Sequence, residues 1–257
     1  MQGVTNDNLL IREVWEANIE EEMALIREIV NDFPWIAMDT EFPGVVAKPV
    51  GSFRTSDELN YQTLRCNVDM LELIQLGLTF SDSEGNLPRC NTEHYCVWQF
   101  NFKEFSLNDD VYAQDSIDLL KESGIDFNEH RQKGCCRYHF AELLFTSGVV
   151  LNEGITWVTF HSSYDFGYLI KLLTCKNLPE NQDEFFEFMG LFFPSLYDMK
   201  YVMKFCDNLH GGLNKLAETL DVERIGPKHQ AGSDSLLTLA TFKKLQKAYF
   251  DDAVSSV

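Results

Sequence analysis

The spacing of apolar residues changes along this chain, and the order of these changes is what most constrains the fold. In the first half, apolar runs at residues 35–38, 71–80 and 95–102 are typical of strands buried in a sheet. After residue 115 most segments carry apolar residues at helical spacing, with two further strands predicted at 157–160 and 195–197. This order predicts an α/β fold, a mixed β-sheet flanked by helices.

The helical segments fall on both sides of the predicted strands. An amphipathic helix is predicted at residues 14–30, before the first strand. Residues 86–94 and 128–139 are predicted to be polar loops, and residues 251–257 a frayed end. No repeat or long linker divides the chain, so we expect a single domain over residues 1–257. The remaining predicted helices cover residues 116–123, 140–146, 166–173, 183–193, 199–205, 213–220 and 235–250.

Composition excludes several classes of protein. With 45% apolar residues in 257, the chain can bury a sizeable core, which excludes a disordered protein. A net charge of −19 argues against a generic DNA-coating or membrane-surface protein, although it does not exclude a nuclease whose acids bind metal ions. No apolar run is long enough to span a membrane, and the first residues lack the pattern of a signal peptide. We therefore expect no membrane association and a cytoplasmic and nuclear location.

The seven cysteines are odd in number and include no CxxC pair, which predicts free thiols in a reducing compartment. Cys90, His94 and Cys96 form the one cluster that suggests zinc. Its spacing fits no zinc-finger pattern and no second pair of ligands accompanies it, so we do not expect a zinc site there.

Two acids stand at the end of the first predicted buried strand. Asp39 and Glu41 are two residues apart, so their side chains leave the same face of the strand while Thr40 points to the other. Two adjacent carboxylates repel each other unless a cation binds them both. For this pair alone, a solvated strand end is the simpler interpretation.

Two further acids stand at predicted helix starts. Asp165 follows a strand and lies three residues after Ser162, and Asp234 directly follows Ser233. We expect each serine to cap its helix, with the acid in the first turn, where the helix dipole favours negative charge. Taken singly, both acids have an ordinary structural explanation.

The four acids together support a more specific hypothesis. If the strand end and the two helix starts converge, the cluster requires divalent cations, and hard oxygen ligands select Mg²⁺ or Mn²⁺. Two such ions can bind a phosphate, activating a water on one side and stabilising the leaving oxygen on the other. His229, in the loop before Asp234, is positioned to accept a proton from that water.

Three long segments carry these residues: 39–46 (DTEFPGVV), 161–169 (HSSYDFGYL) and 224–237 (RIGPKHQAGSDSLL). They resemble the poly(A)-specific nuclease subunit of the eukaryotic CCR-NOT complex, the CCR-NOT-associated factor family. Shorter matching strings are 64–69 (LRCNVD), 74–80 (IQLGLTF), 112–116 (YAQDS) and 141–144 (AELL). The resemblance extends from residue 14 to about residue 250.

The resemblance implies a DEDD exonuclease with a ribonuclease H-like sheet. Residue by residue, it implies Asp39, Glu41, Asp165 and Asp234 as ligands of two divalent cations and His229 as general base. It further implies 3′-to-5′ removal of adenylates from single-stranded poly(A) RNA, with release of AMP. The implied partners are a large scaffold subunit and a second nuclease of the CCR-NOT complex.

Three alternatives remain. The chain could be a non-catalytic scaffold in which the acids only begin helices, or a DEDD nuclease acting on DNA or structured RNA. A serine hydrolase is the third, because Gly232-Ser233-Asp234-Ser235-Leu236 superficially resembles a nucleophile motif, but no GxSxG elbow is present.

The acidic charge opposes binding of a polyanion, so contacts with RNA must be local. Aromatic side chains commonly stack on the bases of single strands, and Phe42 and Tyr164 adjoin the acids. The basic residues near the motifs are Lys48, Arg54, Arg65, Arg224 and Lys228.

Overall fold

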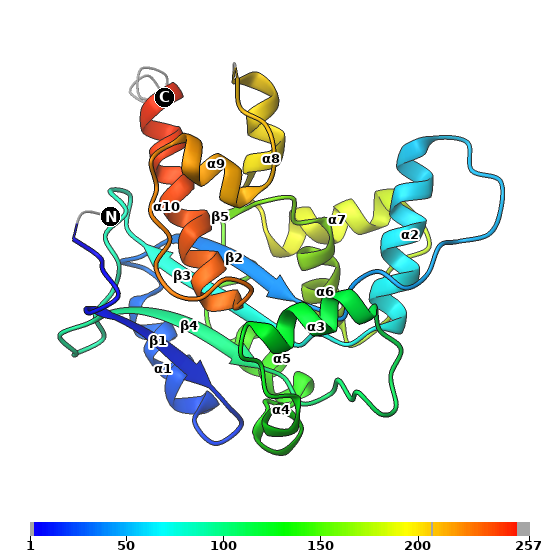
Figure 1. Cartoon of the computed structure of the whole chain (residues 1–257), viewed down its shortest axis with the longest axis horizontal. Helices are drawn as coiled ribbons and strands as arrows, with labels where there is room; N and C mark the ends of the chain where they lie inside the picture. Colours follow the sequence, from blue (N-terminus) through cyan, green and yellow to red (C-terminus); the bar gives the residue numbers. More distant parts are fainter. Residues whose placement is uncertain (1–2, 207, 251–257) are drawn as a thin grey trace.

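Six strands form one mixed sheet in the computed structural model, which describes residues 3–206 and 208–250 (Figure 1). The strand order is β1-β4-β3-β2-β5-β6, and β3 is antiparallel to both of its neighbours, whereas the other pairs are parallel. The strands are β1 (Leu9–Val14), β2 (Trp35–Glu41), β3 (Gln75–Ser81), β4 (Tyr95–Asn101), β5 (Thr156–Thr159) and β6 (Leu196–Asp198). The predicted α/β architecture is therefore confirmed.

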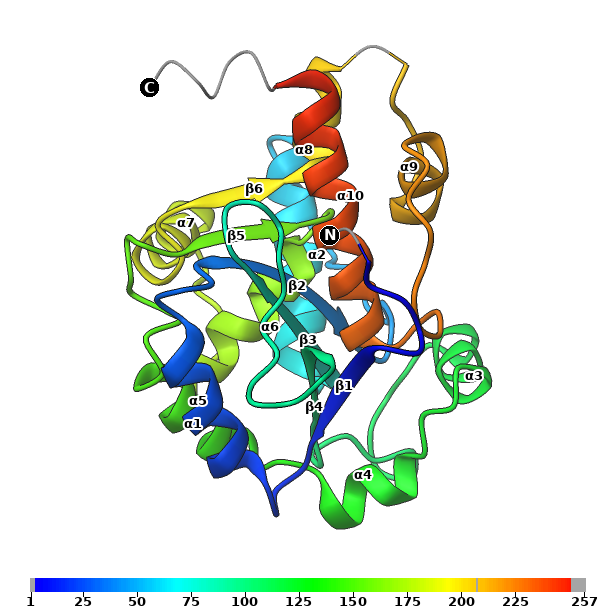
Figure 2. The same cartoon turned by 90° about the vertical axis from the view of Figure 1, so that its left-hand side faces the viewer.

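Helices cover both faces of this sheet. The longest, α10, packs across the central strands on one face, whereas α1 and α5 lie on the other (Figure 2). The helices are α1 (Ile19–Ile29), α2 (Ser56–Met70), α3 (Gln114–Glu122), α4 (Phe127–Lys133), α5 (Arg137–Phe145), α6 (Ser163–Thr174), α7 (Gln182–Phe192), α8 (Met199–Val202), the 3-10 helix η1 (Met203–Phe205), α9 (Leu213–Thr219) and α10 (Ala231–Tyr249).

Each sheet face has its own core because successive side chains of a strand point to opposite faces. In β2, Ile36 and Met38 enter the larger core beneath α1, α5 and α6, whereas Ala37 enters the core beneath α10. By the same alternation Asp39 and Glu41 leave β2 on the α10 face and Thr40 on the α6 face.

Most of the predicted elements are found, with differences at the N-terminus and in one loop. The helix predicted at 14–30 is wrong at its start, because Val14 ends strand β1 and α1 begins at Ile19. The loop predicted at 128–139 is also wrong, since α4 occupies much of it and α5 begins at Arg137. Helix α2 and strand β1 were not predicted from the sequence, and the predicted frayed end, 251–257, lies outside the described residues.

The part of the chain that the structure describes contains no helix with both the length and the apolar character required to cross a membrane.

Candidate active site

The acids Asp39 and Glu41 occupy the carboxyl end of β2, next to the start of α10. Both are partly buried, and Asp39 lies opposite Gly77 of the antiparallel neighbour β3. A Cβ atom at Gly77 would lie 1.8 Å from the carbonyl oxygen of Ala231, the first residue of α10. The missing side chain therefore lets α10 begin directly on the sheet, which brings Asp234 to the level of the two strand acids.

Side-chain amides of the sheet cap the start of α10. Gln99 Oε1 accepts a hydrogen bond from the backbone N–H of Gly232 at 2.8 Å, and Gln75 Oε1 accepts one from Ala231 at 3.2 Å. The prediction that Ser233 caps this helix is wrong, because the helix begins two residues earlier and Ser233 Oγ donates to backbone carbonyls. Buried amides thus satisfy helix donors that would otherwise lack partners.

The start of α6 brings Asp165 to the same strand end from the opposite face of the sheet. Thr40 Oγ1 donates a hydrogen bond of 2.5 Å to Asp165 Oδ1. Ser162 is at the predicted capping position, but its side chain does not cap the helix. Instead, the carboxylate of Asp198 accepts the N–H groups of His161 and Ser162 at 2.9 and 3.0 Å.

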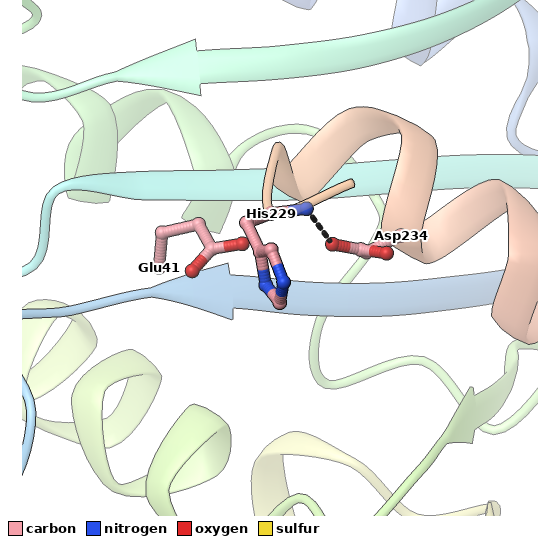
Figure 3. Close-up of side chains that lie close together, drawn as sticks. All are labelled: Glu41, His229 and Asp234. Carbon is pink, nitrogen blue, oxygen red and sulfur yellow. Dashed lines mark hydrogen bonds between the residues drawn. The ribbon is translucent and has the colours of Figure 1, made fainter. Parts of the chain in front are cut away.

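His229 lies in the loop directly before α10, as predicted, beside two of the acids (Figure 3). Its backbone N–H donates to Asp234 Oδ2 at 2.9 Å, and its φ of 59° is left-handed, a conformation uncommon for a residue with a side chain. Potential ligand atoms of Glu41, His229 and Asp234 lie within 4.8 Å of one another. Within residues 3–206 and 208–250, this is the one such group, and Cys90, His94 and Cys96 do not form another.

Burial and mutual repulsion raise the pKa values of three of the clustered carboxyl groups. Burial raises the pKa of Asp39 well above its usual range, and the nearby Asp165, Asp234 and Glu41 raise it further. Burial, followed by Asp234 and Asp165, raises the pKa of Glu41 to about 8. Burial also raises the pKa of Asp165 to about 6, against the lowering effect of the bond from Thr40. The site therefore favours either protons or added positive charge.

Arg224 is the cation closest to this cluster. Its Nη2 lies 2.6 Å from Asp234 Oδ1, and the same nitrogen donates to Asn214 at 2.8 Å. Its charge lowers the pKa of both Asp39 and Glu41, and its Nε is buried with no hydrogen-bond partner. From the sequence, Arg224 was predicted only to be one of several basic residues near the motif segments, and not to be the counter-charge of the acids. Its place in the segment 224–237 was the available signal.

One arginine does not neutralise four carboxylates, and the donor set suits hard divalent cations. Oxygen ligands come from a strand end and two helix starts, with an imidazole beside them. The structure thus brings the four acids and His229, all predicted from the sequence, together at the end of β2.

The two aromatic side chains beside the acids pack partly against the core. Phe42 and Tyr164 stack with ring centroids 5.2 Å apart and an interplanar angle of 14°. Both pack against the larger core, and Phe42 also contacts Tyr168.

Comparison with solved structures supports the fold. The chain aligns with E. coli exonuclease I in complex with a dA16 oligonucleotide at a TM-score of 0.55 and 15% identity, covering 83% of this chain and 40% of that one. This similarity shows that the two chains share a fold, and the predicted ribonuclease H-like sheet is confirmed.

More similar structures include Pop2p of S. pombe in a form with bound Mg²⁺ and Mn²⁺. It aligns at a TM-score of 0.90 and 51% identity, over 95% of each chain. CAF1 co-crystallised with the yeast NOT1 MIF4G domain aligns at a TM-score of 0.78 and 33% identity, over 96% of this chain and 92% of that one.

Sequence relatives agree with the structural ones. A probable CCR4-associated factor 1 homolog, number 7, of Arabidopsis thaliana is 63% identical over 246 residues, which are 95% of this chain and 90% of that protein. The poly(A) ribonuclease pop2 of Schizosaccharomyces pombe is 49% identical over 256 residues, which are 100% of this chain and 75% of that protein. The family described as CAF1 family ribonuclease matches residues 14–142. This chain therefore belongs to the CAF1 family of ribonucleases.

Proposed function

We propose that this protein is a 3′-to-5′ exoribonuclease that removes adenylates from the poly(A) tails of RNA and releases AMP. The observation that carries the proposal is the convergence of four carboxylates and His229 on the end of β2. Membership of the CAF1 ribonuclease family supports it, and a relative of 49% identity is named a poly(A) ribonuclease.

Asp39, Glu41, Asp165 and Asp234 are proposed as the ligands of two divalent cations, Mg²⁺ or Mn²⁺. The raised pKa values of Asp39, Glu41 and Asp165 support this assignment, because a cation compensates charge that burial disfavours. The S. pombe structure with bound Mg²⁺ and Mn²⁺ supports the choice of metals. When bound, such cations activate a water and stabilise the charge of a phosphate undergoing hydrolysis.

The protein side chains have separate tasks in this mechanism. Thr40 orients Asp165 through its hydrogen bond, and the backbone of His229 holds Asp234. The imidazole of His229 takes the proton of the attacking water as general base. Arg224 limits the repulsion among the acids before substrate binds.

Binding of RNA by so acidic a protein must rely on the site itself. The bound cations and the nearby basic residues Lys48, Arg54, Arg65, Arg224 and Lys228 offset the net charge of −19 locally. The exposed parts of Phe42 and Tyr164 offer stacking surfaces for adenine beside the acids.

The proposed partners are the scaffold subunit and a second nuclease of the CCR-NOT complex. The CAF1 co-crystallised with a NOT1 MIF4G domain supports the scaffold partner. We further propose a cytoplasmic and nuclear location, and one domain over residues 1–257.

The test is digestion of an RNA that ends in A20 and is labelled at its 5′ end, in Mg²⁺, in Mn²⁺ and in EDTA. We expect a metal-dependent ladder that shortens from the 3′ end, absent in Asp39→Asn and retained in the exposed control Glu187→Gln. The same RNA ending in U20, and a DNA ending in dA20, should shorten much more slowly. Equal digestion of all three substrates would contradict adenylate specificity, and no digestion by a folded, metal-loaded protein would favour a scaffold.

A further inference from the structure

A row of polar side chains crosses the sheet on the face that α10 covers, at the level of the acids. Glu13 of β1 lies opposite Gln99 of β4, and Asn101 lies two residues further along β4. Asn101 is in turn opposite Gln75 of β3, which is opposite Glu41 of β2. Paired residues and alternate residues of a strand share a face, so the row leads from Glu13 to a proposed metal ligand.

Hydrogen bonds join the amides of this row, and Glu13 fixes their direction. A carboxylate only accepts, and Glu13 accepts from Gln99 Nε2 at 3.0 Å and from Asn101 Nδ2 at 2.8 Å. The amide oxygens of Gln99 and Asn101 therefore face away from Glu13. Gln75 Nε2 donates to the oxygen of Asn101 at 2.8 Å, which leaves the oxygen of Gln75 directed toward α10.

The oxygens of Gln99 and Gln75 are the ones that accept the first N–H groups of α10, those of Gly232 and Ala231, at 2.8 and 3.2 Å. If either amide were turned round, its NH₂ group would face a helix N–H and two buried donors would oppose each other. The position of Asp234, in the same helical turn, therefore depends on the direction of these amides.

Gln230 connects the row to the loop that contains His229, the residue directly before it. Its Oε1 accepts from Gln99 Nε2 at 2.7 Å and from Gln75 Nε2 at 3.3 Å. Its Nε2 donates to the backbone carbonyl of Ser123 at 3.0 Å. The oriented amides thus hold the end of this loop as well as the start of the helix.

The burial of the row makes its direction matter. The exposed fraction is 2% for Gln75 and Gln99 and 1% for Asn101, so water does not replace a lost partner there. Glu13 lies on the edge strand β1 and is exposed along part of its side chain. Burial of its carboxyl group raises its pKa, whereas the hydrogen bonds from Asn101 and Gln99 lower the pKa and so favour the charged form.

We propose that Glu13 is a positioning residue of the nuclease site, whose carboxylate orients the buried amides of β3 and β4 that hold the start of α10, and with it His229 and Asp234. It acts through the amides, because its carboxylate is hydrogen-bonded to two of them. This inference rests on the proposed nuclease function, in which His229 and Asp234 are base and metal ligand.

An exchange of the acid and an amide tests the direction of the row. In Glu13→Gln, an NH₂ group replaces one carboxylate oxygen and opposes the NH₂ group of Gln99 or Asn101. In Glu13→Gln/Asn101→Asp, the introduced amide donates to the introduced carboxylate and still accepts from Gln99. The other oxygen of that carboxylate still accepts from Gln75, so the double variant restores the direction of the row and its charge.

The rate is measured on the A20 RNA in Mg²⁺ with the protein in saturating excess. Under this condition an unfolded fraction does not change the maximal rate, so a lower rate reports on the site. We expect Glu13→Gln to slow it roughly 10–100-fold, the usual cost of disturbing groups that hold metal ligands, and the double variant to recover most of the loss. Glu187→Gln, the same chemical change at an exposed position, should keep the wild-type rate.

Hydrogen exchange followed by mass spectrometry gives a second readout that needs no catalysis. The N–H groups of Ala231 and Gly232 should exchange faster in Glu13→Gln than in the wild type and regain protection in the double variant. If Glu13→Gln does not fold, the double variant decides, because it folds and digests RNA only if the exchanged pair restores the row.

Two results would overturn the proposal: an unchanged rate in Glu13→Gln, or a double variant that is no faster than Glu13→Gln. A wild type that digests no RNA would instead refute the proposed nuclease function. In that case the exchange still decides the role of Glu13: faster exchange in Glu13→Gln supports the orienting role, and unchanged exchange refutes it.

Discussion

Thr40 is the residue through which the two faces of the sheet contribute to one site. Its neighbours Asp39 and Glu41 face α10, whereas its own hydroxyl reaches Asp165 in α6 on the opposite face. The site therefore exists only at the end of β2, where side chains from both faces can curve around the last residues of the strand.

Asp39 provides the clearest test of the proposed metal ligands. We expect Asp39→Asn to abolish hydrolysis, because a ligand is lost, while thermal unfolding in EDTA stays unchanged or shifts to higher temperature. The reason is that burial and three nearby carboxylates already raise the pKa of Asp39, so its charge destabilises the metal-free fold. Calorimetry in EDTA, beside the digestion assay, checks both parts. A large fall in the unfolding temperature would instead assign Asp39 a structural role.

His229 can act as base or as ligand, since it lies close to both Glu41 and Asp234. As a general base, its replacement by Ala should slow the reaction by roughly 10²–10⁴-fold and leave the affinity for Mn²⁺ nearly unchanged. Single-turnover digestion and Mn²⁺ titration by calorimetry measure the two quantities separately. Weaker Mn²⁺ binding in parallel with the rate would identify the imidazole as a metal ligand.

The sequence predicted elements well where one face or both faces of a segment are strongly apolar, and less well elsewhere. The strand end at Glu41 and the helix containing Asp165 were predicted because apolar runs mark them. Helix α4 was missed because only Phe127 and His130 of its seven residues are buried, which leaves no helical pattern to detect. Val14 was assigned to the following helix because a single apolar residue fits both the spacing of a helix and that of a strand.

The residues of the candidate site could be proposed from the sequence, but the contacts that position them could not. All four acids and His229 lie in distinctive local strings, so resemblance found them. The capping of α10 depends on Gln75 and Gln99, which are more than 130 residues away from the helix and offer no local signal. A separation of 36–37 residues likewise hides the pairing of Asp198 with the start of α6, which is found in place of the expected serine cap.

The contact between β3 and α10 depends on Gly77. A methyl group there would overlap the carbonyl of Ala231, which is backbone and cannot rotate away. We expect Gly77→Ala to destabilise the fold by about 1–3 kcal/mol, the usual range for overpacking, and to cost activity by moving Asp234 away from Asp39. Urea unfolding and the digestion assay measure these effects.

Gly190 in α7 is the matched control for this substitution, because it is helical and, apart from its chain neighbours and the backbone of its own helix, no atom lies within 4 Å of the place that a methyl group would take there. Gly190→Ala should stabilise the protein by about 0.5–1 kcal/mol through helix propensity and leave activity unchanged. Equal unfolding midpoints for the two variants would show that α10 tolerates displacement from the sheet.

At the scale of the whole molecule, the acidic cluster links folding stability to both pH and divalent metal. Carboxyl groups whose pKa is raised by folding bind protons more tightly in the folded than in the unfolded chain, so stability falls as pH rises. For Glu41 and Asp165, the fall begins above the ordinary carboxyl pKa of about 4. It is complete above the values of about 8 and about 6 that these two groups reach in the fold.

Mg²⁺ competes with those protons, so it should raise the unfolding temperature more at pH 8.5 than at pH 5, relative to EDTA at the same pH. Glu41→Gln removes the carboxyl group whose pKa is raised to about 8, and in EDTA it should flatten the stability profile between about pH 6 and pH 8. Glu187→Gln makes the same chemical change on the exposed side of α7 and should keep the wild-type profile. Differential scanning calorimetry across this pH range, with and without Mg²⁺, measures the unfolding temperature of the wild type and of both variants. If Mg²⁺ stabilised the protein equally at both pH values, the carboxylates would not be the groups that release protons to it, and the ligand assignment would fail for the whole cluster.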